Sequence, residues 1–333
     1  MSDDARWMAA ALALGGRTRG LTAPNPNVGC VIVRDGVVVG RGWTQPGGRP
    51  HAEAMALAEA GERAAGATAY VTLEPCAHDS TRGPACADLL IAAGVGRIVA
   101  ALGDPDPRTD GSGFARLRFA GVAVETGVLA DAARRSMAGF LTRRAHGRPH
   151  VTLKLALSLD GAVAMVDGRS QWITGDEARA HAHLERSRHE AILVGRGTWE
   201  ADRPRLDVRL PGLAQHIPLR VVLSRRDAAG ASDEAMAGGT PGREPARWIA
   251  APQDIATLPG DHLLVEGGAQ TAAAFLRAGL VDRLLLYRAP ILIGGGRTLG
   301  EIGLAGLADA HGRWTLADQR QLGSDRLEVY ERG

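Results

Sequence analysis

Four side chains in the first third of the chain have the types and order of a catalytic metal centre. His51 and Glu53 lie one residue apart, and two cysteines follow them, Cys76 in a Pro-Cys pair and then Cys86. One imidazole and two thiolates form the ligand set of a catalytic zinc ion that keeps its fourth position for water. Glu53 is not needed as a ligand and is predicted to carry protons.

The chemistry that this set predicts is hydrolytic deamination of a nucleobase-like ring. Zinc lowers the pKa of its water to about 7, and Glu53 would pass the water's proton to the ring nitrogen and the departing ammonia. The alternative interpretation is a closed structural zinc site or unrelated cysteines. Nine residues separate Cys76 from Cys86, whereas the general deaminase signature places two residues between its cysteines.

The elements around these residues would bring them together. The Ala-, Leu- and Glu-containing run at 51–64 predicts a helix, 69–73 predicts a strand that ends before Cys76, and 85–93 predicts a second helix. The metal ligands would then meet where two helix amino termini point. The positive ends of the helix dipoles favour thiolate there.

Strands and helices alternate along the whole chain, which indicates an α/β architecture. An amphipathic helix is expected at the amino terminus, with Trp7, Met8 and Leu12 inward. Further elements of the first half are strands at 28–33, 37–40, 95–102 and 122–124 and a helix at 114–120. The second half is expected to hold strands at 151–157, 191–194, 219–223, 262–265 and 283–287, two more near Trp314 and Leu327, and helices at 177–188 and 271–278. The basic segment 143–149 divides a domain at 1–146 from a domain at 150–333.

Composition limits the possible functions. The 333 residues include 39 Lys and Arg against 37 Asp and Glu, a net charge of +2, which favours a small polar substrate over a nucleic acid. Three cysteines are too few for a disulfide framework and indicate a reducing cytoplasm, and Cys30 is expected in the core. No stretch has the length and apolar character of a membrane span.

Several ordered motifs give the chain a family resemblance. The first half contains PNPNVGC (24–30), HAEAMAL (51–57), YVTLEPCAH (70–78) and GDPDP (103–107). The second contains LKLALSLDGAVA (153–164), SQWITGDEAR (170–179), TWEADRPRLDVR (198–209), LVEGGAQ (264–270) and APILIGGG (289–296). Together with the long cysteine spacing, these motifs resemble the bifunctional deaminase-reductase family of riboflavin biosynthesis.

This resemblance implies a cytidine-deaminase-like three-layer α/β domain followed by a dihydrofolate-reductase-like domain. It also implies two steps. The first is zinc-dependent hydrolytic deamination of 2,5-diamino-6-(5-phosphoribosylamino)pyrimidin-4(3H)-one, and the second is NADPH-dependent reduction of the ribosyl group. Relatives form homo-oligomers, so a homo-oligomer is expected here.

The matched motifs imply particular contacts. In the deaminase pocket the substrate would touch Asn25, His78 and Asp104. In the reductase domain the substrate would touch Ser170, Arg186, Leu206, Arg209 and Glu266, and the cofactor Ala156, Trp172, Thr198, Asp202 and Gly268. Arg186 and Arg209 suit a sugar phosphate. Without the family, Arg186 would be interpreted as a solvated helix residue and Trp172 as a core residue.

Three features depart from the family pattern. The loop between Cys76 and Cys86 is one residue longer than usual, Thr44 stands where histidine is common, and Asp106 replaces the usual asparagine. Arg82 supplies the cation usually found in that loop and would bind phosphate by charge.

Two glycine-containing loops are candidates for nucleotide contacts. Gly195-Arg196-Gly197 resembles the start of a dinucleotide fingerprint, but Glu200 replaces the third glycine, which argues against a Rossmann fold. Gly267-Gly268 is the better loop for close phosphate approach.

Charged residues elsewhere in the second half are further candidates. Arg225 or Arg226 is expected to meet the 2′-phosphate of NADPH, with an exposed loop charge as the equal alternative. Lys154 and Asp160 are candidate proton donors with a structural alternative.

Two other functions fit part of this pattern. A deaminase whose reductase has decayed would lack the motifs at 170–175 and 266–268, yet both are present. A nucleic-acid-editing deaminase would need a basic groove, which the balanced charge disfavours.

Overall fold

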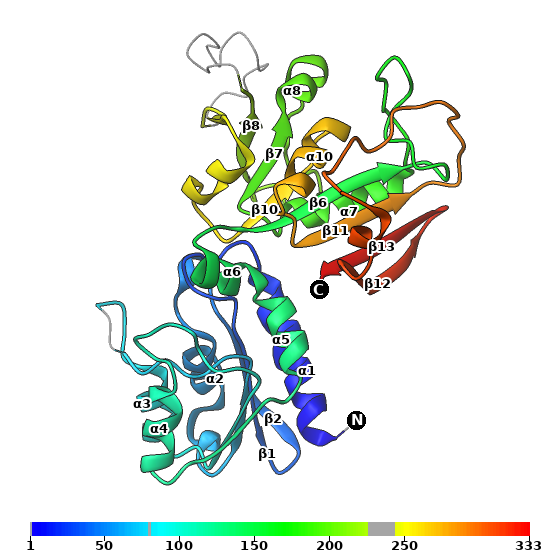
Figure 1. The fold of residues 1–333 in the computed structure, drawn as a ribbon. Coiled ribbons are helices and arrows are strands. Elements are labelled where there is room, and N and C mark those ends of the chain that lie inside the picture. The colour runs from blue at the N-terminus through cyan, green and yellow to red at the C-terminus, as the bar shows by residue number, and fades with distance from the viewer. Residues whose placement is uncertain (1, 79–80, 226–243) are drawn as a thin grey trace. The chain divides into compact units, whose positions relative to one another are not determined.

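The computed structural model describes residues 2–78, 81–225 and 244–333. The chain forms two compact units, Met1–Gly147 and Arg148–Gly333 (Figure 1). Among the described residues, no helix is both long enough and apolar enough to cross a bilayer. Residues 226–243, and with them the candidate Arg226, lie outside the described part of the chain.

The first unit is a five-stranded sheet covered by helices on both faces. The strand order is β2-β1-β3-β4-β5, with β1 antiparallel to both neighbours and the remaining pairs parallel. The strands are β1 Gly29–Arg34, β2 Val37–Trp43, β3 Thr68–Val71, β4 Arg97–Ala100 and β5 Ala123–Thr126. The helices are α1 Asp3–Gly15, α2 Ala52–Ala60, α3 Cys86–Ala92, α4 Ser112–Phe119, α5 Ala130–Ser136 and α6 Ala138–His146.

Glycines in β1 and β2 let two helices approach the sheet closely. A Cβ on Gly29 would lie 1.8 Å from the carbonyl oxygen of Ala11 in α1, and one on Gly42 would lie 2.0 Å from that of Ala52 in α2. Gly42 pairs with Cys30, the neighbour of Gly29 in β1. Because successive residues of a strand face opposite sides, α1 and α2 pack on opposite faces.

Replacing Gly42 with alanine should destabilise the first unit and weaken its metal site. The new Cβ would collide with the backbone of α2, and such overpacking costs about 1–3 kcal/mol. Because His51 caps α2, a displaced helix also moves an expected metal ligand. Calorimetry should show a lower Tm, and chelator competition a lower zinc affinity. The control is Gly16→Ala, whose Cβ meets nothing within 4 Å; equal losses in the two variants would contradict this explanation.

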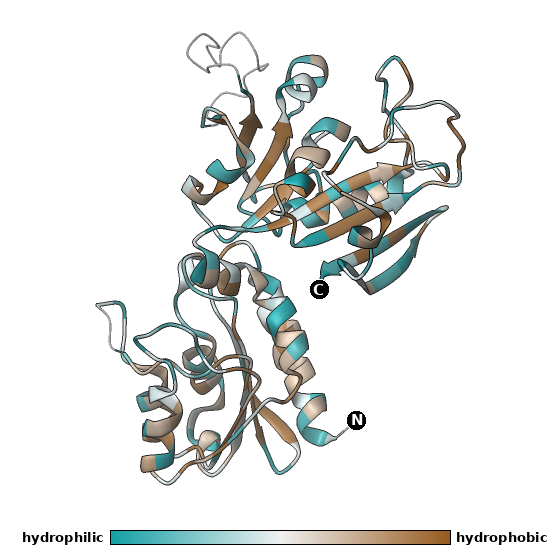
Figure 2. Ribbon diagram, viewed as in Figure 1, coloured by the Kyte–Doolittle hydropathy of each residue, from teal (hydrophilic) through white to brown (hydrophobic). Residues whose placement is uncertain are grey.

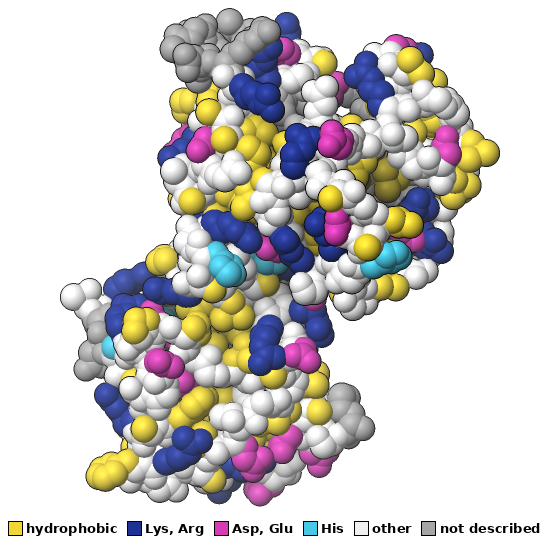
Figure 3. Space-filling view, viewed as in Figure 1, with side chains coloured by type: hydrophobic (Ala, Val, Ile, Leu, Met, Phe, Trp, Pro, Cys, Tyr) yellow, Lys and Arg dark blue, Asp and Glu magenta, His cyan; other side chains and the backbone are white. Residues whose placement is uncertain are grey.

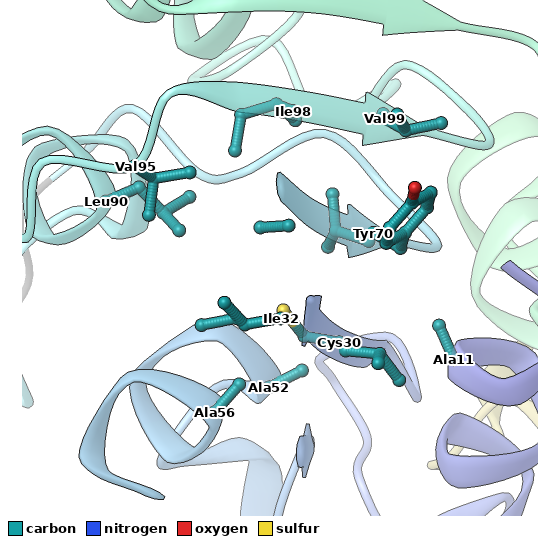
Figure 4. Packing of buried hydrophobic residues seen from close by; sticks show 14 of the residues in the cluster. Ala11, Cys30, Ile32, Ala52, Ala56, Tyr70, Leu90, Val95, Ile98 and Val99 are labelled. Carbon is teal, nitrogen blue, oxygen red and sulfur yellow. The ribbon is translucent and has the colours of Figure 1, made fainter. Parts of the chain in front are cut away.

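The core of this unit agrees with the sequence prediction in most places. Met8 is buried, whereas Trp7 and Leu12 are only partly buried against the core. Cys30 is fully buried, and Figure 4 shows it among apolar side chains of the sheet and α2. Cys30 is therefore a core residue, as expected.

Turn residues account for two boundaries near the site. Asp35 and Gly36 have φ angles of 51° and 73°, which suits a two-residue hairpin turn between β1 and β2. The helix predicted at 51–64 is shorter than expected. It ends at Ala60 because Gly61 has a φ of 56°, and a 3-10 turn, Gly61–Ala64, follows.

The second unit is built on an eight-stranded sheet with the order β12-β13-β11-β6-β10-β7-β8-β9. The pairs from β11 to β9 are parallel, and β13 is antiparallel to both β11 and β12. The strands are β6 His150–Leu157, β7 Ala191–Gly195, β8 Leu219–Leu223, β9 Arg247–Ile249, β10 His262–Val265, β11 Arg283–Arg288, β12 Trp314–Leu322 and β13 Asp325–Arg332. The helices are α7 Asp176–Arg186, α8 Arg196–Asp202 and α10 Ala269–Arg277.

The central parallel strands of this sheet are apolar on both faces (Figure 2). Leu193 of β7 packs in one cluster with Phe275 of α10, and its neighbour Val194 packs in another with Trp199 of α8. Strands covered on both sides have this continuous apolar character. Ligands of such sheets bind at the carboxyl ends of the strands.

Glu190, directly before β7, should make the stability of the second unit depend on pH. Burial, with a contribution from Asp261, raises the pKa of Glu190 from 4.5 to about 7. Between pH 4.5 and about pH 7 the folded state binds more protons than the unfolded state. The free energy of unfolding therefore falls as the pH rises through this range. Glu190→Gln removes the charge and can still accept the N–H of His262, which lies 2.9 Å away. When the pH is raised from 5 to 8, the free energy of unfolding of the variant should increase by on the order of 2–3 kcal/mol relative to that of wild type. Urea unfolding at both pH values measures this gain, and a difference independent of pH would count against it.

Candidate active sites

His51, Cys76 and Cys86 converge in the first unit. The His51 Nδ1 atom lies 3.6 Å from the Cys76 Sγ and 3.4 Å from the Cys86 Sγ. All three donor atoms lie within 4.8 Å of one another. Zinc bonds of about 2.0 Å to nitrogen and 2.3 Å to sulfur, at a tetrahedral angle, separate the two donors by about 3.5 Å. The triangle therefore has the size that a zinc ion with three protein ligands requires.

Local backbone structure explains this convergence. His51 is the N-cap of α2, and Cys86 is the first residue of α3. The backbone N–H of Cys86 donates to the Cys76 Sγ at 3.3 Å, and that of Ala87 donates to the Cys76 carbonyl oxygen at 3.2 Å. Both ends of the loop between the cysteines are thus tied together.

The two thiols of this cluster shift each other's pKa in opposite directions. A hydrogen bond from Cys86 lowers the pKa of Cys76 to about 4, and the same bond together with burial raises the pKa of Cys86. Glu53 is 3% exposed, and burial raises its pKa to about 7. A carboxyl group with a pKa near the working pH can both accept and release a proton.

A cavity of about 180 Å³ includes His51, Cys76 and Glu53 in its lining. The predicted substrate contacts Asn25, His78 and Asp104 also line it. Thr44 and Asp106, which differ from the family pattern, line the cavity as well, as does Arg82 of the loop between Cys76 and Cys86. The Nδ2 of Asn25 donates to the Gly48 carbonyl oxygen at 2.8 Å, which leaves the amide oxygen of Asn25 as an acceptor.

Glu74 organises another part of this cavity, a role that was not predicted from the sequence. Its Oε2 accepts the backbone N–H groups of Asp104 and Gly111 at 3.2 and 3.0 Å, and its Oε1 accepts that of Phe114 at 3.0 Å. Glu74 therefore links the segment that holds Cys76 to the loop that holds Asp104. A sequence signal exists, since Glu74 is an acidic residue directly after an apolar strand.

A cavity of about 480 Å³ in the second unit includes residues from β6 and β7 and from the segment after β10. Its lining contains the predicted substrate contacts Ser170, Arg186, Leu206, Arg209 and Glu266 and the predicted cofactor contacts Ala156, Trp172, Thr198, Asp202 and Gly268. Arg225 is exposed and is not part of the lining.

The two candidate proton donors have different surroundings. Lys154 lines the cavity, and burial lowers its pKa. Asp160 instead accepts the backbone N–H groups of Ile293 and Gly294 at 3.2 and 2.8 Å, which supports its structural alternative.

Glu266 is the centre of an ionic cluster in this cavity. Its carboxylate accepts the Nε and Nη2 of Arg186 at 2.6 and 2.9 Å, and the Nζ of Lys154 lies 4.0 Å away. Burial alone would raise the pKa of Glu266, but Arg186 lowers it to about 2. Arg186 also donates to the Asp207 carbonyl oxygen at 3.0 Å. Arg186 is thus held in place rather than solvated, contrary to the alternative interpretation of its position.

Trp172 is exposed rather than part of the core. Its side chain belongs to the cavity lining, and the residue is 66% exposed. The guanidinium of Arg179 lies 4.9 Å from the centroid of the indole ring. Arg179 and His183 also line this cavity and were not among the contacts predicted from the sequence.

Comparison with known proteins assigns the family. Residues 1–102 match the cytidine and deoxycytidylate deaminase zinc-binding region, and residues 149–327 match the RibD C-terminal domain. The riboflavin biosynthesis protein RibD of Escherichia coli is 41% identical over 97% of each chain. This chain belongs to the RibD family. RibD of Mycobacterium tuberculosis is 42% identical over 93% of this chain and 92% of that protein.

Solved RibD structures share the fold of the whole chain. Acinetobacter baumannii RibD is 37% identical with a TM-score of 0.87, and the Thermotoga maritima deaminase/reductase is 30% identical with a TM-score of 0.86. Each match covers 99% of both chains. The chain is thus a bifunctional deaminase and reductase of riboflavin biosynthesis, and the predicted cytidine-deaminase-like and dihydrofolate-reductase-like folds are confirmed.

The loop Gly267-Gly268 leads into α10, whose N-cap is Gly268. A Cβ on Gly267 would lie 2.4 Å from the Cβ of Thr271. In this chain the requirement for glycine at position 267 therefore comes from the packing of α10, whether or not a nucleotide is bound.

Proposed function

We propose that the chain carries out two successive steps on one riboflavin precursor. The domain at 1–146 removes an amino group by hydrolysis from 2,5-diamino-6-(5-phosphoribosylamino)pyrimidin-4(3H)-one. The domain at 150–333 then reduces the ribosyl group with NADPH and yields 5-amino-6-(5-phosphoribitylamino)uracil. The observation that carries the proposal is the triangle of His51, Cys76 and Cys86 with Glu53 buried beside it.

In the deaminase domain, His51, Cys76 and Cys86 hold a zinc ion, which their donor spacing fits. Bound zinc supplies a water molecule with a pKa of about 7. The Glu53 carboxylate would carry two protons in turn, the first from that water to the ring nitrogen and the second from the added hydroxyl group to the departing ammonia, whose C–N bond breaks. Asn25, His78 and Asp104 bind the substrate, and the free amide oxygen of Asn25 suits a ring amino group.

In the reductase domain, one cavity receives both the ribosylamine phosphate and NADPH. Substrate contacts come from Ser170, Arg186, Leu206, Arg209 and Glu266, and cofactor contacts from Ala156, Trp172, Thr198, Asp202 and Gly268. Glu266 fixes the Arg186 guanidinium, so that the arginine is oriented before substrate binds. NADPH supplies the hydride, and the protein supplies position and electrostatics.

Arg225 is proposed to bind the 2′-phosphate of NADPH from outside the described cavity lining. The guanidinium fork fits a phosphate dianion, and Arg225 follows β8 directly after Ser224. Arg225→Ala should reduce the preference for NADPH over NADH by about tenfold or more, measured as the ratio of kcat/KM for the two cofactors. An unchanged ratio in both Arg225→Ala and Arg226→Ala would overturn this assignment.

The proposed setting is a homo-oligomer in the cytoplasm with a small-molecule substrate. Three free cysteines support a reducing compartment. Acidic and basic side chains are interspersed on the face drawn in Figure 3, which gives that face little resemblance to a nucleic-acid groove. Light scattering coupled to size exclusion tests the oligomer.

The deciding experiment supplies the diaminopyrimidinone ribosylamine phosphate to purified, zinc-loaded protein. Ammonia release should come first, and the fall in NADPH absorbance should follow it. Ammonia release without NADPH consumption would support the alternative of a non-functional reductase and overturn the two-step proposal.

A further inference from the structure

Two arginines at the deaminase cavity are tied to one buried carboxylate, that of Asp106. The Oδ1 of Asp106 accepts the backbone N–H and the Nε of Arg108 at 3.0 and 2.9 Å. Its Oδ2 lies 2.6 Å from the Nη2 of Arg108 and 2.9 Å from the Nη2 of Arg144. The Asp106 side chain is 5% exposed, whereas those of Arg108 and Arg144 are 59% and 38% exposed. All three residues line the cavity. The buried carboxylate of Asp106 therefore holds two positively charged side chains at the cavity wall.

The charge of this group favours an anion. Two guanidinium groups face one carboxylate, which leaves one positive charge, and Arg49 and Arg82 line the same cavity. The other acidic groups of the lining are Glu53, Glu74 and Asp104. Both oxygens of Glu74 are occupied by backbone N–H groups, and burial raises the pKa of Asp104 to about 6. An anionic part of a ligand is therefore attracted to this region.

The remaining N–H groups of the two arginines suit phosphate in particular. A guanidinium has five N–H donors. Arg108 gives its Nε and Nη2 to Asp106, and Arg144 gives its Nη2, so both retain donors for a second acceptor. The Arg144 guanidinium is also held 5.3 Å from the centroid of the Phe140 ring. Planar donor forks that are fixed before binding lose little freedom when they meet phosphate oxygens.

We propose that Asp106 positions Arg108 and Arg144 as the binding site for the phosphate group of the deaminase substrate. This inference rests on the proposed function, because it assigns one part of that substrate to one part of the cavity. A neutral amide at position 106 would leave both guanidinium charges without a counter-ion. The aspartate and the two arginines therefore act as one unit in this chain. Asp106 is a positioning residue, and the arginines contact the ligand.

The test compares ammonia release from the phosphorylated substrate and from the same compound without its phosphate, using zinc-loaded full-length protein. Arg144→Ala should lower the ratio of kcat/KM for the two compounds on the order of 10- to 100-fold, through KM more than kcat. Asp106→Asn should change the ratio in the same direction. Arg143→Ala is the matched control, because Arg143 is the neighbour of Arg144 in α6 and does not line the cavity.

Titration of inorganic phosphate by calorimetry gives a readout that does not depend on turnover. Wild type and Arg143→Ala should bind phosphate, and Arg144→Ala should bind it at least about tenfold more weakly. An unchanged substrate ratio, or equal phosphate affinity in wild type and Arg144→Ala, would overturn the inference. If wild type releases no ammonia from either compound, the proposed function fails, and the phosphate titration still decides the role of the arginines.

Discussion

Replacing Glu53 with alanine should abolish ammonia release while zinc stays bound. His51, Cys76 and Cys86 provide the three donor atoms, so loss of the Glu53 carboxylate removes no ligand. Proton transfer by a positioned group contributes about 10²- to 10⁴-fold to a rate, and Glu53 is the proposed carrier for both protons of the reaction. Ammonia release should therefore fall at least about 1000-fold, while the metal content measured by mass spectrometry stays the same.

Two further variants make this result specific. Glu53→Gln keeps the size of the buried side chain and should lose activity to a similar extent. Glu59→Ala removes an acidic residue of the same helix, which pairs with Arg41 away from the cavity, and should keep full activity. Metal loss in Glu53→Ala and Glu53→Gln, with zinc retained in Glu59→Ala, would mean that Glu53 supports the metal site rather than the proton transfer.

Replacing Glu266 with glutamine should block NADPH consumption and leave ammonia release intact. Glu266 balances Arg186, whose side chain is 15% exposed, and is 4.0 Å from Lys154. A neutral amide leaves these cations without their counter-charge, and breaking a buried pair costs about 3–5 kcal/mol. We expect reduction of the deaminated intermediate to slow about 100-fold or more, measured at saturating NADPH by the loss of cofactor absorbance.

The matched control for this result is Glu301→Gln, an exposed residue outside the lining of the cavity. It should leave both activities at wild-type values. Normal NADPH consumption in Glu266→Gln would show that the charge of Glu266 is dispensable. A parallel loss of ammonia release would show that the substitution damages more than the reductase cavity.

The sequence predicted the site best where a reactive side chain lies in or next to the helix or strand that positions it. His51 and Glu53 lie at the start of one helix, and Cys76 follows a strand whose apolar residues define it. Spacing along the chain therefore predicted their convergence. Helices α5, α6 and α8 and strand β9 were not predicted. These elements are short, nine residues at most, and the period of a short run is difficult to distinguish in sequence.

The supporting contacts could not be predicted in the same way. Glu74 binds backbone N–H groups at Asp104, Gly111 and Phe114, between 30 and 40 positions along the chain. Neither composition nor periodicity predicts that a carboxylate will accept hydrogen bonds from backbone groups far away in the sequence. The pairing of Asp106 with Arg144 is equally hidden, although the departure from asparagine at 106 drew attention to one partner.

The loop between Cys76 and Cys86 is closed at its ends by the N–H groups of Cys86 and Ala87, which bind the Sγ and carbonyl oxygen of Cys76. These bonds fix the distance between the two thiolates. Metal binding therefore does not require a particular number of residues between Cys76 and Cys86. Lengthening such a loop from eight to nine residues costs only about 0.1 kcal/mol of closure entropy. Insertions and deletions here are therefore expected to be close to neutral for folding. A change in the length of this loop should affect the binding of a ligand before it affects the coordination of the metal.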